Sequence, residues 1–241
     1  MSTENLLKFI EECSKNWSPA DLNDIKIEEC SCPITGRGMK AKTAISKGDV
    51  LISIPRELAI TARKLRYADS SLLILYEGGN TIQKCDKISY RELFIWFLVY
   101  EKRKESSEYK VFIESLPSSY ENPVFWSDED VKKLPKDSQL RVDSEKVKLK
   151  SSYERLNTVL KRNEIDLVSE NEFEWAYGSL MTRCFYWGSP ESRAEMAEIN
   201  HQAILPSPDS NYAMVPLVDM LNHHCIKGQG STAELRTQSK Y

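Results

Sequence analysis

The spacing of apolar and polar positions changes along the chain. Between about residues 23 and 54, apolar residues tend to alternate with polar ones, the spacing typical of half-buried strands. From about residue 61 to residue 189 the apolar spacing is close to 3.6, typical of amphipathic helices, with few glycines and prolines and no internal repeat. This pattern predicts an α+β fold in which a β-rich core is split by a large, mostly helical insertion.

The N-terminal β-rich part contains a pair of glycines. Strands are predicted over residues 23–29 and 50–54, residues 39–44 also alternate, and residues 46–49 have the composition of a turn between them and the second strand. Gly36 and Gly38 flank one residue, and positive φ angles there would expose backbone N–H groups in a nest suited to a carboxylate or phosphate. We therefore predict a glycine turn before a hairpin-like β unit. The alternative is a turn that binds nothing; a dinucleotide fingerprint is excluded because a strand follows instead of a helix.

Capping signals locate the helices of the insertion. Ser89 precedes a helix predicted over residues 90–104, whose middle is so apolar that it must be buried on most sides. Ser127 followed by Asp130 predicts a short helix that ends before Pro135. Two more helices are predicted, one from the apolar face of Leu149, Tyr153, Leu156 and Leu160, and one over residues 173–186 from the capping box of Ser169 and Glu172.

Near its end the chain has an apolar run, Val215–Leu221, that contains the acidic residue Asp219 and stops in Asn222 and His223. An apolar segment of this length predicts a buried element, and a carboxylate inside it needs a partner. The amide and imidazole groups at its end would lie at the rim of a ligand site. The alternative is a short core helix capped by Asn222.

Composition excludes several classes of protein. The chain has 241 residues, 41% of them hydrophobic and 29% charged, and its net charge of −3 gives no basic field to favour nucleic acid or an anionic membrane. The longest aromatic and aliphatic run, residues 93–100, is too short to cross a bilayer. Six cysteines without regular spacing are expected to be reduced thiols of an intracellular protein, and Cys30 with Cys32 lacks the second pair that a zinc site needs.

Three segments in one order resemble a known family. They are residues 35–39, Trp175-Ala176 with Thr182-Arg183, and residues 215–223. Together they resemble the SET-domain protein methyltransferases of the Rubisco large-subunit methyltransferase type, and within them the branch called SET domain-containing protein 4. The resemblance implies an N-terminal helical segment (1–24), a first part of the SET core (25–60), a helical insertion (61–210) and a second, truncated part of the SET core (211–241).

The resemblance implies that S-adenosylmethionine lies between the glycine turn and the Asn-His element. Arg183 would bind the methionine carboxylate, for which a guanidinium fork is well suited, unless it is a surface cation. Asp219 would brace the site, or would be a structural carboxylate bonded to backbone. The other residues that the family likeness assigns to the cofactor are Thr35, Gly36, Arg37 and Gly38 at the methionine and ribose end, and Asn222 and His223 at the adenine and amino-acid parts.

The family's reaction is transfer of a methyl group from the sulfonium sulfur to a neutral side-chain nitrogen, usually of lysine, without a metal. The implied partner is a protein substrate, histone or non-histone, that presents a lysine, with no direct binding of nucleic acid or membrane. A location in the cytoplasm, the nucleus or both is expected. Desolvation in a narrow apolar channel would lower the pKa of that lysine so that it can lose its proton.

The chain departs from the family pattern in one respect. The family has a tyrosine in an aromatic-Tyr-Gly segment well downstream of Asn-His, and only eighteen residues follow His223 here. No catalytic residue is therefore assigned, the SET core is expected to be incomplete at its C-terminus, and we expect impaired methyl transfer by this chain. The alternatives are a non-catalytic SET-like scaffold that binds a protein partner, and a helical adaptor in which the glycine and Asn-His segments are merely turns and caps.

Overall fold

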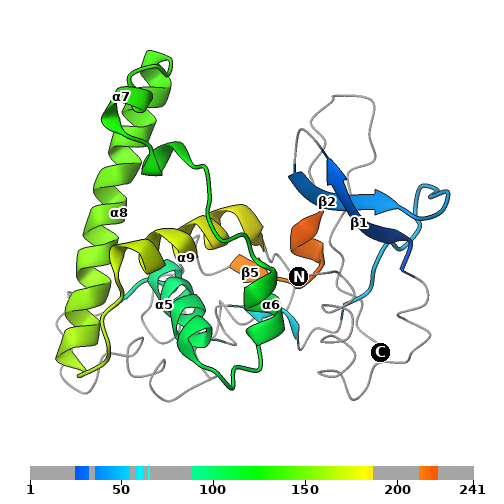
Figure 1. Ribbon diagram of the computed structural model, residues 1–241, viewed down its shortest axis with the longest axis horizontal. Helices are drawn as coiled ribbons and strands as arrows, with labels where there is room; N and C mark the ends of the chain where they lie inside the picture. Colours follow the sequence, from blue (N-terminus) through cyan, green and yellow to red (C-terminus); the bar gives the residue numbers. More distant parts are fainter. Residues whose placement is uncertain are drawn as a thin grey trace, which may run out of the picture.

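Two small sheets and a group of helices make up the described part of the molecule. In Figure 1 the helices gather on one side, the hairpin β1–β2 lies on the other, and β5 with the orange 3-10 helix that follows it lies between them. The predictions for residues 1–24, 190–210 and 233–237 lie outside the described residues. The computed structural model describes residues 25–32, 36–54, 58–61, 65, 88–186 and 212–221.

The first sheet is an antiparallel hairpin of β1 (Ile27–Cys32) and β2 (Gly36–Ala41). A hairpin is present, but it pairs residues 27–32 with residues 36–41, whereas the prediction paired residues 39–44 with residues 50–54. The strand predicted over 23–29 begins at residue 27 and continues to residue 32. Residues 50–54 were expected to be the second strand, and they form no strand; the carbonyl of Leu51 accepts one hydrogen bond from the backbone N–H of Lys26, at 3.1 Å.

The prediction of a glycine turn at 36–38 is wrong. Gly36 pairs with Cys32 and Gly38 pairs with Cys30, so the segment is the first half of β2. An extended strand pairs its backbone groups with its neighbour and does not gather successive N–H groups into a nest. Among the described glycines only Gly48 has a positive φ, at 98°. It lies in the predicted turn at 46–49, which is confirmed by the hydrogen bond from the Asp49 N–H to the Ser46 carbonyl at 3.1 Å.

The second sheet joins three segments that are far apart in the sequence. Its strands β3 (Ile60–Thr61), β5 (Tyr212–Met214) and β4 (Cys184–Tyr186) lie in the order β3–β5–β4, all antiparallel. The helix predicted over 173–186 therefore ends three residues early, because Cys184 has an extended backbone and pairs with Met214. Strand β4 lies within the segment that the sequence assigned to the helical insertion.

The predicted helix caps are confirmed, and the helix expected from residue 173 begins at residue 170. The side chains of Ser89, Ser127 and Ser169 each accept a hydrogen bond from the first turn of a helix, and Ser89 and Ser169 form capping boxes with Glu92 and Glu172. None of the helices in the described ranges is long and apolar enough to cross a membrane. The helical elements between residues 88 and 186 are α5 (Tyr90–Arg103), α6 (Lys110–Ser115), η3 (Pro123–Phe125), α7 (Asp128–Val131), α8 (Lys136–Arg162) and α9 (Glu170–Arg183).

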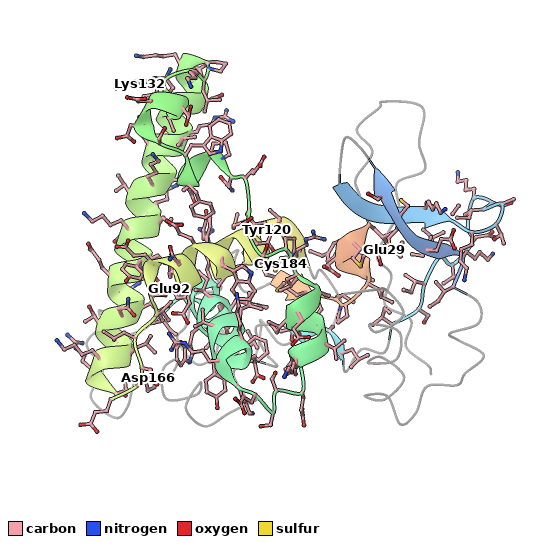
Figure 2. All side chains as sticks on the ribbon, viewed as in Figure 1. Glu29, Glu92, Tyr120, Lys132, Asp166 and Cys184 are labelled. Carbon is pink, nitrogen blue, oxygen red and sulfur yellow. The ribbon has the colours of Figure 1, made fainter. Side chains whose placement is uncertain are left out.

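Helix α5 is the centre of the core. Its middle, residues 93–99, is buried on all sides, as its composition predicts, and it packs against α9. Its one fully buried charge, Glu92, accepts hydrogen bonds from Arg155 Nε at 2.8 Å and Ser152 Oγ at 2.6 Å on α8, besides its capping bond at 2.6 Å to the Ser89 N–H. Figure 2 shows Glu92 where these helices meet. A buried carboxylate with this many donors fixes α8 against α5.

An ion pair holds the start of α9 to the end of α5. Arg103 Nε donates to Glu172 Oε1 at 2.8 Å, and Arg103 Nη2 donates to Glu172 Oε2 at 2.7 Å. The Arg103 guanidinium, with further hydrogen bonds from Ser169, lowers the pKa of Glu172 from 4.5 to about 2. The pair is bidentate, which is the geometry in which a partly exposed ion pair contributes most.

Replacing Glu172 with Gln should destabilise the protein in a pH-dependent way. Because the folded state lowers the pKa of Glu172 to about 2, its charge stabilises the fold above about pH 4.5, and this contribution is lost as the pH falls toward 2. Gln retains the capping geometry, so the difference isolates the charge. Urea unfolding at a series of pH values should give a gap between wild type and Glu172→Gln that shrinks as the pH is lowered from 7 to 3. The exposed Glu170→Gln is the matched control, and a gap for Glu172→Gln that stays constant over this range would contradict the assignment.

Candidate functional site

Two predicted site residues meet where α9 ends. Arg183 is the last residue of α9, and Asp219 lies in the 3-10 helix η5 (Val218–Met220). Arg183 Nη1 donates to the backbone carbonyl of Asp219 at 3.0 Å and lies 3.6 Å from its Oδ2. The side chains are 17% and 2% exposed, respectively, so Arg183 is not a surface cation. The structure thus brings together a cation and a carboxylate that are 36 residues apart.

The pairing of β4 with β5 explains why they meet. Cys184 directly follows Arg183 and pairs with Met214, which places the end of α9 beside the start of the apolar run. The chain then turns at Leu217, whose φ of 68° and ψ of −39° are rare for a residue with a side chain. Such a conformation costs on the order of 1–3 kcal/mol. The Leu217 side chain is fully packed in the core, which offsets this cost and fixes the position of Asp219.

The predicted burial of the apolar run is confirmed. All residues from 213 to 220 are buried. The core helix expected as the alternative is only one 3-10 turn long, held by hydrogen bonds from the Asp219 N–H to Val215 at 3.0 Å and from the Leu221 N–H to Val218 at 3.1 Å. The predicted site residues Thr35, Asn222 and His223 lie outside the described residues.

The glycine segment also reaches this place. Strand β2 lies against η5, and in Figure 1 the hairpin stands beside the orange η5. Gly38 is buried, and the neighbouring Met39 packs against the core cluster that contains Leu217 and Met220. The backbones of Gly36 and Arg37 lie in the same strand. All three segments of the family resemblance therefore converge, although the glycines do so as a strand.

A further polar group of the site, the hydroxyl of Tyr120, was not predicted. The Tyr120 ring lies against α9 at Gly178, where an added Cβ would be 2.5 Å from Tyr120 Cδ2. Its hydroxyl lies beside those of Ser179 and Thr182, and close enough to Arg183 to be influenced by its charge. Burial raises the pKa of Tyr120, so the hydroxyl stays protonated. The sequence does show a glycine, Gly178, inside an aromatic-rich helix, which indicates a close approach of another group. It does not indicate which residue makes that approach.

The neighbouring thiol is not suited to nucleophilic chemistry. Burial raises the pKa of Cys184, and the negative charge of Asp219 raises it further. A neutral thiol is a weak nucleophile and a poor metal ligand. In the part of the chain that the structure describes, no three His, Cys, Asp or Glu side chains gather as a metal site. The site offers instead a fixed cation, a carboxylate and hydroxyl groups, which together suit a polar ligand with an acidic group.

Replacing Gly178 with Ala should destabilise the protein by displacing Tyr120. The new Cβ would lie 2.5, 2.7 and 2.9 Å from Cδ2, Cγ and Cβ of Tyr120, closer than packed carbon atoms can be. We expect a loss of about 1–3 kcal/mol from overpacking, against a gain of about 1 kcal/mol in helix propensity. Urea unfolding followed by circular dichroism would measure it. In a Tyr120→Ala background the Cβ has room, so Gly178→Ala should there be neutral or stabilising; the same loss in both backgrounds would contradict the proposed contact.

Comparison with known proteins finds SET domain-containing protein 4 and protein N-methyltransferases among the relatives. No protein-family model matches the chain. SET domain-containing protein 4 of Artemia parthenogenetica is 25% identical over 87% of this chain and 47% of the relative. The chloroplastic [fructose-bisphosphate aldolase]-lysine N-methyltransferase of Arabidopsis thaliana is 26% identical over 83% of this chain and 37% of the relative. The actin-histidine N-methyltransferase of Xenopus tropicalis is 24% identical over 90% of this chain and 34% of the relative.

Solved structures of Rubisco LSMT share the fold. The SET domain of LSMT bound to MeLysine and AdoHcy superposes with a TM-score of 0.67 and 21% identity over 95% of this chain and 46% of that chain. Rubisco LSMT bound to AdoMet gives a TM-score of 0.64 with 21% identity, over 92% and 44%. The chain therefore has the α+β fold of a SET domain, and its resemblance to the SET-domain methyltransferases of the Rubisco LSMT type is confirmed. It spans between about a third and a half of the length of the three relatives above, from 34% to 47%.

Proposed function

We propose that this chain belongs to an S-adenosylmethionine-dependent protein-lysine N-methyltransferase and carries its cofactor site. The observation that carries the proposal is the placement of Arg183 at the end of α9, against Asp219 of η5, with strand β2 packed on the same turn. These elements belong to the segments of the family resemblance. The similarity to LSMT structures bound to AdoMet and AdoHcy supports the same ligand here.

Arg183 is prepared to bind a carboxylate. Its short contact, 3.0 Å, is to a neutral carbonyl, whereas the Asp219 carboxylate is 3.6 Å away. A closed Arg–carboxylate fork has two N–O distances of about 2.7–2.9 Å, so Asp219 orients the guanidinium without using its fork. The remaining N–H groups can pair with the carboxylate of the methionine part. Asp219 thus braces the cation, as the resemblance implies.

When bound, S-adenosylmethionine supplies a methyl group on a sulfonium sulfur, which can be transferred to the neutral amine of a substrate lysine. In this chain Arg183 would bind and orient the amino-acid end, and the buried run 213–220 would exclude water from one wall of the site. Thr35, the backbone of Gly36, Arg37 and Gly38, and the pair Asn222 and His223 complete the proposed contacts. The extended shape of 36–38 favours main-chain contact along β2 over an anion nest.

The proposed substrate is a lysine of a histone or non-histone protein. The [fructose-bisphosphate aldolase]-lysine N-methyltransferase among the relatives supports this choice, and an actin-histidine N-methyltransferase among them makes histidine the competing target. The net charge of −3 favours neither nucleic acid nor anionic membrane as a direct partner. We also propose that the protein is located in the cytoplasm, the nucleus or both.

Replacing Arg183 should weaken S-adenosylmethionine binding. Calorimetric titration of wild type, Arg183→Met and Arg183→Lys should show saturable binding that weakens by about tenfold to a hundredfold in the Met variant, the range expected for a lost bond to a charged group. Lys keeps the charge without the fork and should lie between them. Arg141→Met, an exposed arginine on α8, is the matched control and should bind as wild type does.

Two outcomes would count against the proposal. Absence of saturable binding by folded wild type would remove the cofactor site and leave the non-catalytic scaffold. Equal binding by wild type and both Arg183 variants would show that the ligand lies elsewhere. Asn222→Ala extends the test to the Asn-His segment. Measured methyl transfer to a lysine-containing protein would test the reaction itself, and rapid turnover by this chain would contradict the expectation of impaired activity.

A further inference from the structure

The hydroxyl of Tyr120 is held in place from two directions. Gly178 lets the ring lie directly on the backbone of α9, within 2.5 Å of where a Cβ would be. The segment that carries Tyr120 is tied to the same helix by the indole of Trp175, whose Nε1 donates to the Pro117 carbonyl at 2.9 Å. In Figure 2 Tyr120 and Cys184 are labelled at the C-terminal end of α9, the end that carries Arg183. The position of the hydroxyl is therefore determined by packing.

This hydroxyl is buried and has a hydrogen left to donate. Ser179 Oγ donates to the Trp175 carbonyl at 2.9 Å, and Thr182 Oγ1 donates to the Gly178 carbonyl at 2.7 Å. Each has spent its only hydrogen on the helix, so neither can donate to Tyr120, and each oxygen can only accept from it. The Tyr120 oxygen lies beside both and makes no hydrogen bond of ordinary geometry within the described part of the chain.

An unpaired buried hydroxyl costs about 1–3 kcal/mol, and such groups in native structures call for an explanation. Here the formal charges that act on the hydroxyl are those of Arg183, five residues beyond Gly178, and of its neighbour Asp219. A carboxylate that enters to pair with Arg183 would arrive next to the Tyr120 hydroxyl. A phenol O–H is a good donor to such a group, since hydrogen bonds to ionised acceptors are the stronger ones.

We propose that Tyr120 is a ligand-binding residue of this site, whose hydroxyl donates to the same ligand carboxylate that Arg183 binds. The inference rests on the proposed cofactor site and assigns it a second donor, contributed by the segment between α6 and η3. The helical insertion then takes part in cofactor recognition directly, through Tyr120. Until the ligand arrives, the hydroxyl oxygens of Ser179 and Thr182 are the acceptors that lie beside the Tyr120 hydrogen, and the ligand carboxylate is the stronger acceptor.

The test compares two ligands that differ in the carboxylate. Calorimetric titration of Tyr120→Phe with S-adenosylmethionine should show binding about tenfold to a hundredfold weaker than wild type. With 5′-methylthioadenosine, which has the adenosine and sulfur but no carboxylate, Tyr120→Phe and wild type should bind alike. Phe keeps the ring over Gly178, and thermal unfolding checks that the fold is retained. Tyr177→Phe is the matched control: its hydroxyl donates to Glu145 on α8 at 2.9 Å, so its loss should leave both affinities unchanged.

The outcomes separate this inference from the proposed function. If wild type fails to bind S-adenosylmethionine, the cofactor site and the role of Tyr120 both fail. If Arg183→Met weakens binding while Tyr120→Phe does not, only the role of Tyr120 is overturned. If Tyr120→Phe weakens both ligands equally, the hydroxyl acts through the structure of the site and does not contact the carboxylate. A selective loss for S-adenosylmethionine supports the inference.

Discussion

The contact between Arg183 and Asp219 depends on a change of backbone conformation at a single position. Helix α9 ends at Arg183, and the next residue is already strand, paired with Met214. Because that pairing is antiparallel and β5 leads directly into η5, the last side chain of the helix comes to rest on the Asp219 carbonyl. A helix one turn longer would take up the residues of β4, and the pairing with β5 that brings Asp219 to Arg183 would be lost. The short sheet β3–β5–β4 thus sets the geometry of the candidate site.

Helix α9 also connects this site to the rest of the insertion. Its first turn is held to α5 by the ion pair of Glu172 with Arg103, its middle receives the Tyr120 ring at Gly178, and its end carries Arg183. Each contact lies on a different part of the helix, so the helix is fixed along its length as well as by the core. A rigid element that is anchored in this way can hold a guanidinium within the narrow limits that ligand binding requires.

The sequence was informative where structure depends on nearby residues. Ser89, Ser127 and Ser169 marked helix starts because a cap and its partner are three residues apart, and the burial of residues 213–220 followed from their apolar run. It failed where the partner is distant. The extended form of Gly36–Gly38 depends on β1, the end of α9 depends on β5, and the contact of Tyr120 depends on a glycine 58 positions later. Local propensity gives no information on these long-range contacts. The ends of the strands and the place of the Tyr120 hydroxyl in the site therefore became visible only in the tertiary structure.

Leu217 shows how the chain holds the turn that presents Asp219. A glycine would adopt its positive φ without strain, yet the position holds a leucine that is 1% exposed. Burying a leucine side chain contributes about 1.5–3 kcal/mol, similar to the 1–3 kcal/mol that the backbone conformation costs. Glycine would remove the strain and the packing together, and the turn would then have more than one accessible conformation. With leucine at this position, the unusual backbone conformation is stable only while the side chain is packed in the core. Because Asp219 follows two residues later and orients Arg183, the precision of the polar site derives from the apolar side chain beneath it.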